Sequence, residues 1–485
     1  MLLRTFVDEK LAHYSYLVGC QATGEAIVID PMRNIEPYLE TAAREGVRIV
    51  GAAETHIHAD FVSGARELAD RVGATLYLSD EGDENWKYRY LDGLPHRLLK
   101  DGDTIPIGNI RLEVLHTPGH TPEHLSFLLY DLPATQKPIG IFTGDFVFVG
   151  DVGRPDLLEA AAGLAGTAVP GARQMFQSLK RFKALPDHLQ VWPAHGAGSA
   201  CGKALGAVPS STVGYEKLTN WALQIDDEDA FVEALLADQP EAPKYFKHMK
   251  RINKEGPALL RELREPVRFG ADEKTLARLQ AEGVQIVDAR PQAAFQEGHL
   301  PGSINIPLGK SFTTWAGWLV DYDRPLAVVA DEAAEEEIRI ALRSIGLDRL
   351  EGFIAPADVL ARGPEKLDRY ANVRPEDVKD RLGDFFILDV RSESERKAGA
   401  LDGSTHIMLG HLPDRLAEVP KDRPILVHCE LGGRSAIAAS LLRANGYRAV
   451  YNLLGGYAEL KQALDRVDAP LNAERLRSDR RLLNA

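Results

Sequence analysis

The C-terminal half of the chain contains an internal repeat, and this repeat limits the folds that are open to it. In each copy a buried strand ends in Asp-x-Arg, with Asp288 in the first copy and Asp389 in the second. A second apolar run, which ends at Ala330 or at Cys429, precedes an apolar-periodic helix and a glycine. The copies are 101 residues apart at the aspartates and 99 residues apart at the second pair. The repeat therefore predicts two successive α/β modules.

Length and composition exclude several classes of protein. The chain has 485 residues, enough for about three domains. Its net charge of -14 disfavours nucleic acid as a partner, and its 3 cysteines exclude a secreted disulfide framework. No apolar run reaches the roughly 18 residues of a membrane span, and the charged N-terminus is unlike a signal peptide. We expect a soluble, cytoplasmic enzyme that binds neither nucleic acid nor membrane, and a homo-oligomer is compatible with these features.

The part of the chain before the repeat also has an α/β pattern. Short apolar runs alternate with helical patterns and turn signals, and histidines stand at strand ends. A polar, proline-containing stretch at 215–264 predicts a last helix and a linker. We therefore expect three domains, at 1–250, 265–365 and 370–475.

Four predicted strand ends in this first part carry histidine or aspartate. They place His56, His58 and Asp60 after one strand, His120 after another, Asp145 after a third and His195 after a fourth. A histidine excess can be a scatter of surface residues, but 10 of the 14 histidines precede residue 250 and they cluster in short motifs. Imidazole and carboxylate groups at converging strand ends are typical of a transition-metal site.

These motifs resemble those of the metallo-β-lactamase superfamily, whose fold is an αβ/βα sandwich. The first motif of that family usually ends in Asp-His, whereas here Asp60 is followed by Phe61. A phenyl ring cannot bind a metal, so the departure favours a mononuclear site over a dinuclear zinc hydrolase.

Within the superfamily the motifs resemble those of persulfide dioxygenases, also called sulfur dioxygenases. The shared runs are Thr-His-x-His-Ala-Asp, Thr-Pro-Gly-His-Thr-Pro, Phe-Thr-Gly-Asp, Gly-Arg-Pro-Asp and Pro-Ala-His. The resemblance implies one Fe(2+) per chain, bound by His56, His120 and Asp145, with a persulfide and O2 as substrates. It also implies a supporting role around the metal for three further residues, which would orient the ligands, the substrate or water. They are His58, Asp60 and His195.

Two further residues near these motifs have two readings each. Arg154, nine residues after Asp145, is a candidate contact for an anionic substrate or a member of a surface salt bridge. Cys201, six residues after His195 among small residues, is a candidate sulfur carrier or a plain loop cysteine.

The second copy of the repeat carries a candidate nucleophile. Cys429 ends a buried strand and is followed by Glu-Leu-Gly-Gly and then Arg434 at a helix start. Loop N–H groups, the helix N-terminus and Arg434 all favour a thiolate at Cys429. Cysteine phosphatases need five residues between cysteine and arginine, and here there are four. The module resembles a rhodanese, or sulfurtransferase, domain.

The first copy also resembles a rhodanese domain, but its loop has no nucleophile. Ala330 replaces the cysteine, and the residues that follow it are acidic and include no arginine before the helix. Acidic groups cap a helix N-terminus well but cannot attack sulfur. We predict that this copy is catalytically silent and serves as a spacer or docking unit.

Together the resemblances imply a persulfide dioxygenase fused to a sulfurtransferase. The iron site would produce sulfite and thiol, and Cys429 would move sulfur between persulfide, sulfite and thiosulfate. One alternative is a glyoxalase II-like thioester hydrolase with an attached sulfur carrier, which Phe61 disfavours. Another is a non-catalytic sulfur-relay or interaction protein, which the acidic loop at Ala330 favours.

Overall fold

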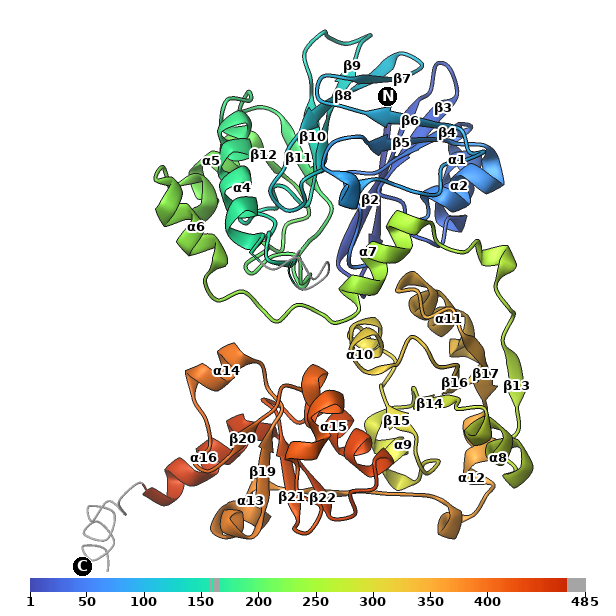
Figure 1. Ribbon diagram of the computed structural model, residues 1–485, viewed down its shortest axis with the longest axis vertical. Coiled ribbons are helices and arrows are strands. Elements are labelled where there is room, and N and C mark those ends of the chain that lie inside the picture. Colours follow the sequence, from blue (N-terminus) through green and yellow to red (C-terminus); the bar gives the residue numbers. More distant parts are fainter. Residues whose placement is uncertain (158, 160–165, 469–485) are drawn as a thin grey trace, which may run out of the picture. The chain divides into compact units, whose positions relative to one another are not determined.

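The computed structural model describes residues 1–157, 159 and 166–468 (Figure 1). The chain divides into two compact units. The first unit contains Met1–Pro266 together with two segments of the first repeat, Gly309–Asp323 and Ala333–Glu351. The second contains the remainder of the two repeats. This is a division by packing, and the three domain boundaries stay a prediction.

Two six-stranded sheets form the centre of the first unit. The first sheet contains β1 (Leu2–Asp8), β2 (His13–Cys20), β3 (Glu25–Ile29), β4 (Arg48–Ala53), β5 (Thr75–Ser79) and β6 (His96–Leu99). The second contains β7 (Thr104–Ile107), β8 (Ile110–His116), β9 (Leu125–Asp131), β10 (Gly140–Gly144), β11 (Gln190–Pro193) and β12 (Ser211–Thr212). One buried cluster joins their facing sides, with Val18 and Ile27 from one sheet and Phe127 and Phe142 from the other.

Helices cover the outer face of each sheet (Figure 1). The first sheet packs against α1 (Glu36–Glu45) and α2 (Ala65–Val72), and the second against α4 (Ala168–Lys183) and α6 (Glu228–Leu236). The helix α5 (Val213–Thr219) lies between α4 and α6 in the chain, and α7 (Phe246–Glu255) follows α6. The layers helix–sheet–sheet–helix are the predicted αβ/βα sandwich.

The two copies of the repeat have the same strand order. The first contains β13 (Val267–Phe269), α8 (Glu273–Ala281), β14 (Gln285–Asp288), α9 (Gln292–Glu297), β15 (Ile304–Asn305), α10 (Phe312–Leu319), β16 (Leu326–Val329), α11 (Glu335–Ser344), β17 (Leu350–Ile354) and α12 (Pro356–Leu360). The second contains β18 (Ala371–Val373), α13 (Pro375–Val378), β19 (Phe386–Asp389), α14 (Glu393–Ala398), β20 (Thr405–His406), β21 (Ile425–His428), α15 (Gly433–Ala444), β22 (Val450–Leu453) and α16 (Gly456–Asp468). Their sheets run β13-β17-β16-β14-β15 and β18-β22-β21-β19-β20, which confirms the repeat.

The predicted Asp-x-Arg strands are the central strands β14 and β19. Each pairs in parallel with a strand on either side, so it lies in the interior of its sheet, and each ends in a fully buried aspartate. Within the described ranges, no helix is both long enough and apolar enough to cross a membrane.

Candidate metal centre and sulfur-transfer loop

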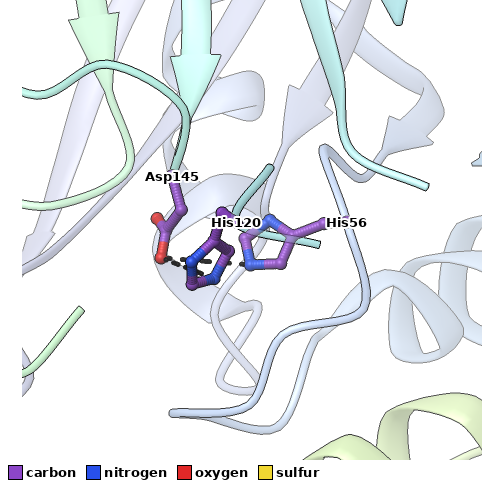
Figure 2. Close-up of side chains that lie close together, drawn as sticks. All are labelled: His56, His120 and Asp145. Atoms are coloured by element: carbon purple, nitrogen blue, oxygen red, sulfur yellow. Dashed lines mark ion pairs between the residues drawn. The ribbon is translucent and has the colours of Figure 1, made fainter. Parts of the chain in front are cut away.

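The predicted metal ligands stand just beyond strand ends and meet in one buried site. His56 follows β4, His120 lies in the turn between β8 and β9, and Asp145 follows β10. Asp145 Oδ2 lies 3.4 Å from His120 Nε2 and 4.0 Å from His56 Nε2. Figure 2 shows the three side chains directed toward one another from separate segments. The convergence predicted from the strand ends is therefore present.

Three polar atoms at this meeting point have no hydrogen-bond partner among the residues that the structure describes. They are His56 Nε2 and both carboxylate oxygens of Asp145, and all three side chains are almost fully buried. A buried carboxylate that accepts no hydrogen bond is unfavourable unless a cation balances its charge. Two imidazoles and one carboxylate are a donor set that a divalent transition metal suits, so the residues fit a metal ion.

Neighbouring groups orient the two histidines. His56 Nδ1 lies 3.0 Å from Thr55 Oγ1, and that hydroxyl donates to Asp30 at 2.9 Å. His120 Nδ1 donates to the carbonyl oxygen of Arg154 at 3.0 Å. Since the Nδ1 atoms hold the ring protons, both Nε2 lone pairs face the site.

Asp145 and His58 are also held in place. The backbone N–H of Asp145 donates to His124 Nε2 at 3.1 Å. The Nε2 atom of His58 lies 3.0 Å from Asp30 Oδ1. Burial lowers the pKa of His58, but the Asp30 carboxylate outweighs this effect and raises the pKa to about 9. Asp30 thus holds both Thr55 and His58 in place.

A second cluster lies beside the metal centre and contains Asp60, His195 and Cys201. His195 Nε2 lies 3.1 Å from Asp60 Oδ2 and 3.4 Å from Asp145 Oδ1, so this histidine lies between the two carboxylates. Cys201 is buried, and burial followed by the charges of Asp145 and Asp60 raises its pKa to about 12. The thiol is thus neutral at pH 7 and a weak nucleophile.

Arg154 forms a salt bridge, but in the interior rather than at the surface. Its side chain is 2 % exposed, and it donates to the Asp156 carboxylate and to the carbonyl oxygen of Pro240. Its backbone N–H donates to the carbonyl oxygen of Cys201 at 3.3 Å. Arg154 thus joins the His120 turn to the loop of Cys201, and its guanidinium is engaged by protein groups.

Phe61 fills the position where the family pattern has a histidine. Its ring lies 4.4 Å from that of His58 and 4.0 Å from that of His13, centroid to centroid. His13 is fully buried, and burial lowers its pKa far below the usual value. The sequence alone did not identify His13, Asp30 or His124 as residues of the site. The sequence did contain a signal for Asp30. This residue directly follows the apolar strand β3, just as Asp145 directly follows β10.

The second repeat builds a compact loop around Cys429 between β21 and α15. Gly432 has a φ of 97°, a conformation that favours glycine, and its N–H lies 3.1 Å from Cys429 Sγ. The hydroxyl of Ser435 lies 3.6 Å from the same sulfur. These donors and the N-terminus of α15 face the sulfur, as predicted.

Two ion pairs frame this loop. Arg434 donates to both carboxylate oxygens of Glu395 at 2.6 Å, and Arg391 donates to Glu430 at 3.0 Å. Burial raises the pKa of Glu395, but the hydrogen bonds from Arg434 and from Ser392 outweigh it and bring the pKa to about 2. The arginine of the loop is therefore paired with a permanent anion.

Comparison with known proteins assigns the parts of the chain. The model of the metallo-beta-lactamase superfamily matches residues 9–195, and that of the rhodanese-like domain matches 272–349 and 374–463. The crystal structure of a metallo-beta-lactamase from Staphylococcus aureus subsp. aureus COL is 42% identical, covers 73% of this chain and 99% of its own, and has a TM-score of 0.66. The chain belongs to the metallo-beta-lactamase superfamily. Its C-terminal half adds two rhodanese-like domains.

Two curated relatives each match about two fifths of the chain. The mitochondrial persulfide dioxygenase ETHE1 of Bos taurus is 29% identical over 206 residues, which are 40% of this chain and 68% of the bovine protein. A hydroxyacylglutathione hydrolase of Rhodospirillum rubrum is 33% identical over 183 residues, which are 38% of this chain and 62% of the hydrolase. The chain is thus similar both to a persulfide dioxygenase and to a hydroxyacylglutathione hydrolase.

Proposed function

We propose that the chain is an iron-dependent persulfide dioxygenase joined to a sulfurtransferase in the cytoplasm. In this reaction a low-molecular-weight thiol persulfide, O2 and water give sulfite and the free thiol. The observation that supports it best is the buried set of His56, His120 and Asp145 beside Phe61, because these three ligands leave positions open at one metal ion. When bound there, one Fe(2+) per chain supplies the coordination and redox chemistry of O2.

The residues of the chain supply orientation and charge in this proposal. Thr55 and the carbonyl of Arg154 keep the two histidine Nε2 atoms free of protons. His195, between Asp60 and Asp145, orients substrate or water. Cys201 is the remaining candidate sulfur carrier, although its high pKa favours a packing role.

At the second centre, Cys429 is the proposed nucleophile. Its thiolate takes a sulfane sulfur from a persulfide or thiosulfate, and the donor leaves as thiol or sulfite. The cysteine persulfide then passes that sulfur to sulfite or to a thiol. Gly432 N–H and the N-terminus of α15 stabilise negative charge on sulfur, both in the thiolate and in the persulfide form of Cys429. Arg434 is the last residue of the proposed loop. Joining the two centres in one chain raises the concentration of sulfite that Cys429 encounters.

A metal-dependent thioester hydrolase is the second candidate, because hydroxyacylglutathione hydrolases are among the relatives. Phe61 argues against it, since it removes a nitrogen ligand from the position where a second metal would bind.

Elemental analysis combined with oxygen uptake tests the proposal. We expect one iron per chain, and His56→Ala, His120→Ala and Asp145→Ala should each remove both the iron and oxygen consumption. His195→Ala should keep most of the iron and lower turnover. His188→Ala, an exposed histidine on the same domain, is the matched control and should change neither. Two zinc ions per chain with thioester hydrolysis and no oxygen uptake would contradict the proposal.

A further inference from the structure

Two helices of the cysteine-free repeat belong to the same compact unit as the metal centre. They are α10 and α11, in the segments Gly309–Asp323 and Ala333–Glu351. A spacer or a docking unit for a partner would not need to belong to the same compact unit as the metal centre. The contacts of these helices within the unit therefore indicate what the silent repeat does.

The first set of contacts holds the backbone of the loop that follows His56. Asn253 of α7 is buried, and its Nδ2 donates to the carbonyl oxygens of His58 at 2.9 Å and Phe61 at 2.7 Å. Its Oδ1 accepts from the backbone N–H of Ser63 at 2.9 Å. The N–H of Val62 donates to the carbonyl oxygen of Ser344, the last residue of α11, at 2.7 Å. One side of residues 58–63 thus depends on α7 and α11.

A buried ion pair anchors the end of α11 to the metal domain. Arg33 is 2 % exposed and donates to both carboxylate oxygens of Asp348, at 2.5 and 2.9 Å. It also donates to the carbonyl oxygens of Arg343 at 2.7 Å and Ala258 at 2.9 Å. Arg33 lies three residues after Asp30, which binds both Thr55 and His58. The anchor therefore joins α11 to the segment that orients His56.

The helix α10 makes a third contact, through Tyr245. A Cβ atom added at Gly317 would lie 2.4 Å from the Tyr245 ring, so the helix backbone rests directly on that ring. Tyr245 is buried and immediately precedes α7. Burial and then the charge of Asp60 raise the pKa of Tyr245 far above the usual value.

We infer that the cysteine-free rhodanese repeat is a positioning part of the metal centre: α10 and α11 fix residues 58–63 and with them the geometry of His56 and Asp60. The inference rests on the proposed metal site but not on the reaction proposed for it. In this role the repeat needs its helices and not a nucleophile, which agrees with an acidic loop at Ala330.

Two variants of the full-length chain test the inference, with Co2+ as the metal probe. Asp348→Ala leaves Arg33 buried without its carboxylate, and Asn253→Asp keeps the shape of the side chain but loses both donors to residues 58 and 61. We expect each to weaken Co2+ binding at least tenfold in a chelator competition and to alter the visible absorption of the bound Co2+. Sulfur transfer from thiosulfate to a thiol at Cys429 should stay at the wild-type level, because Cys429 lies in the other compact unit.

Two further variants separate positioning from general stability. Arg33→Met with Asp348→Leu removes both charges and should recover Co2+ affinity relative to Asp348→Ala, because it leaves no unpaired buried ion. Glu336→Ala breaks only an exposed ion pair with Arg339 on the same helix and should match the wild type. If Asp348→Ala and Asn253→Asp bind Co2+ with wild-type affinity and spectrum, the inference is wrong. If both shift as expected while the wild type consumes no oxygen, the inference stands and the proposed reaction fails.

Discussion

The two rhodanese-like copies share a scaffold and differ in one loop. In the first, Arg290 pairs with Asp288 and donates to the carbonyl oxygen of Gly298 at 3.0 Å. In the second, Arg391 pairs with Asp389 and donates to the carbonyl oxygen of Gly399 at 2.7 Å. All four charged side chains are buried. The ion pair that follows each central strand is therefore a requirement of the fold and not of sulfur chemistry.

The loops that follow the next strand show where the chemistry resides. After β21, Cys429 is followed by glycines that turn backbone N–H groups toward its sulfur. After β16, Ala330 is followed by a short 3-10 helix, Glu332–Ala334, and by the acidic first turn of α11. A handful of loop residues thus distinguishes a candidate catalyst from a silent copy, while the packed strands remain the same.

The largest effect should come from Cys429→Ser, which removes the nucleophile of the active copy. Sulfur transfer from thiosulfate should fall by roughly four orders of magnitude or more, as expected when a nucleophile is lost. Oxygen uptake with a supplied persulfide should stay largely intact, because the metal ligands lie in the other compact unit. Cys20→Ser, at a buried cysteine on β2, is the control and should retain both activities. A parallel fall in oxygen uptake would mean that Cys429 feeds the metal centre.

An intermediate effect should come from breaking the shared ion pair in each copy. Asp288→Ala and Asp389→Ala each remove the buried carboxylate that pairs with a buried arginine, which should lower the free energy of unfolding by about 3 to 5 kcal/mol. Calorimetry should show a similar loss for both, whereas sulfur transfer should fall only with Asp389→Ala. A loss confined to one of the two variants would show that the scaffolds are not equivalent.

The smallest effect should come from giving the silent copy a cysteine. Ala330→Cys in a Cys429→Ser background should show no sulfur transfer above that background. The carboxylates after residue 330 raise the pKa of a thiol there and repel sulfite and thiosulfate. Mass spectrometry after exposure to a persulfide is the measurement. Ready formation of a persulfide on the introduced cysteine would contradict this account of the loop.

Much of this molecule could be predicted from local sequence. The repeat, the α/β class and the meeting of His56, His120 and Asp145 follow from strand-ending motifs, because α/β folds place their sites at strand ends. The loop around Cys429 was also predictable, because the strand, the glycine turn and the start of the helix are contiguous in the chain.

Other features depend on contacts between distant residues and leave no local pattern. The sequence shows no arginine in the acidic loop after Ala330, yet the fold brings Arg268 of β13 to within 2.7 Å of Glu332. It leaves Arg154 as either a contact for an anionic substrate or a member of a surface salt bridge, yet packing buries that side chain in an internal salt bridge. The contacts of Asn253 and Ser344 with residues 58–63 join backbone groups far apart in the chain. Sequence by itself determined which groups can do the chemistry. Tertiary structure decided what holds them, because a buried polar group must find its partner wherever packing supplies one.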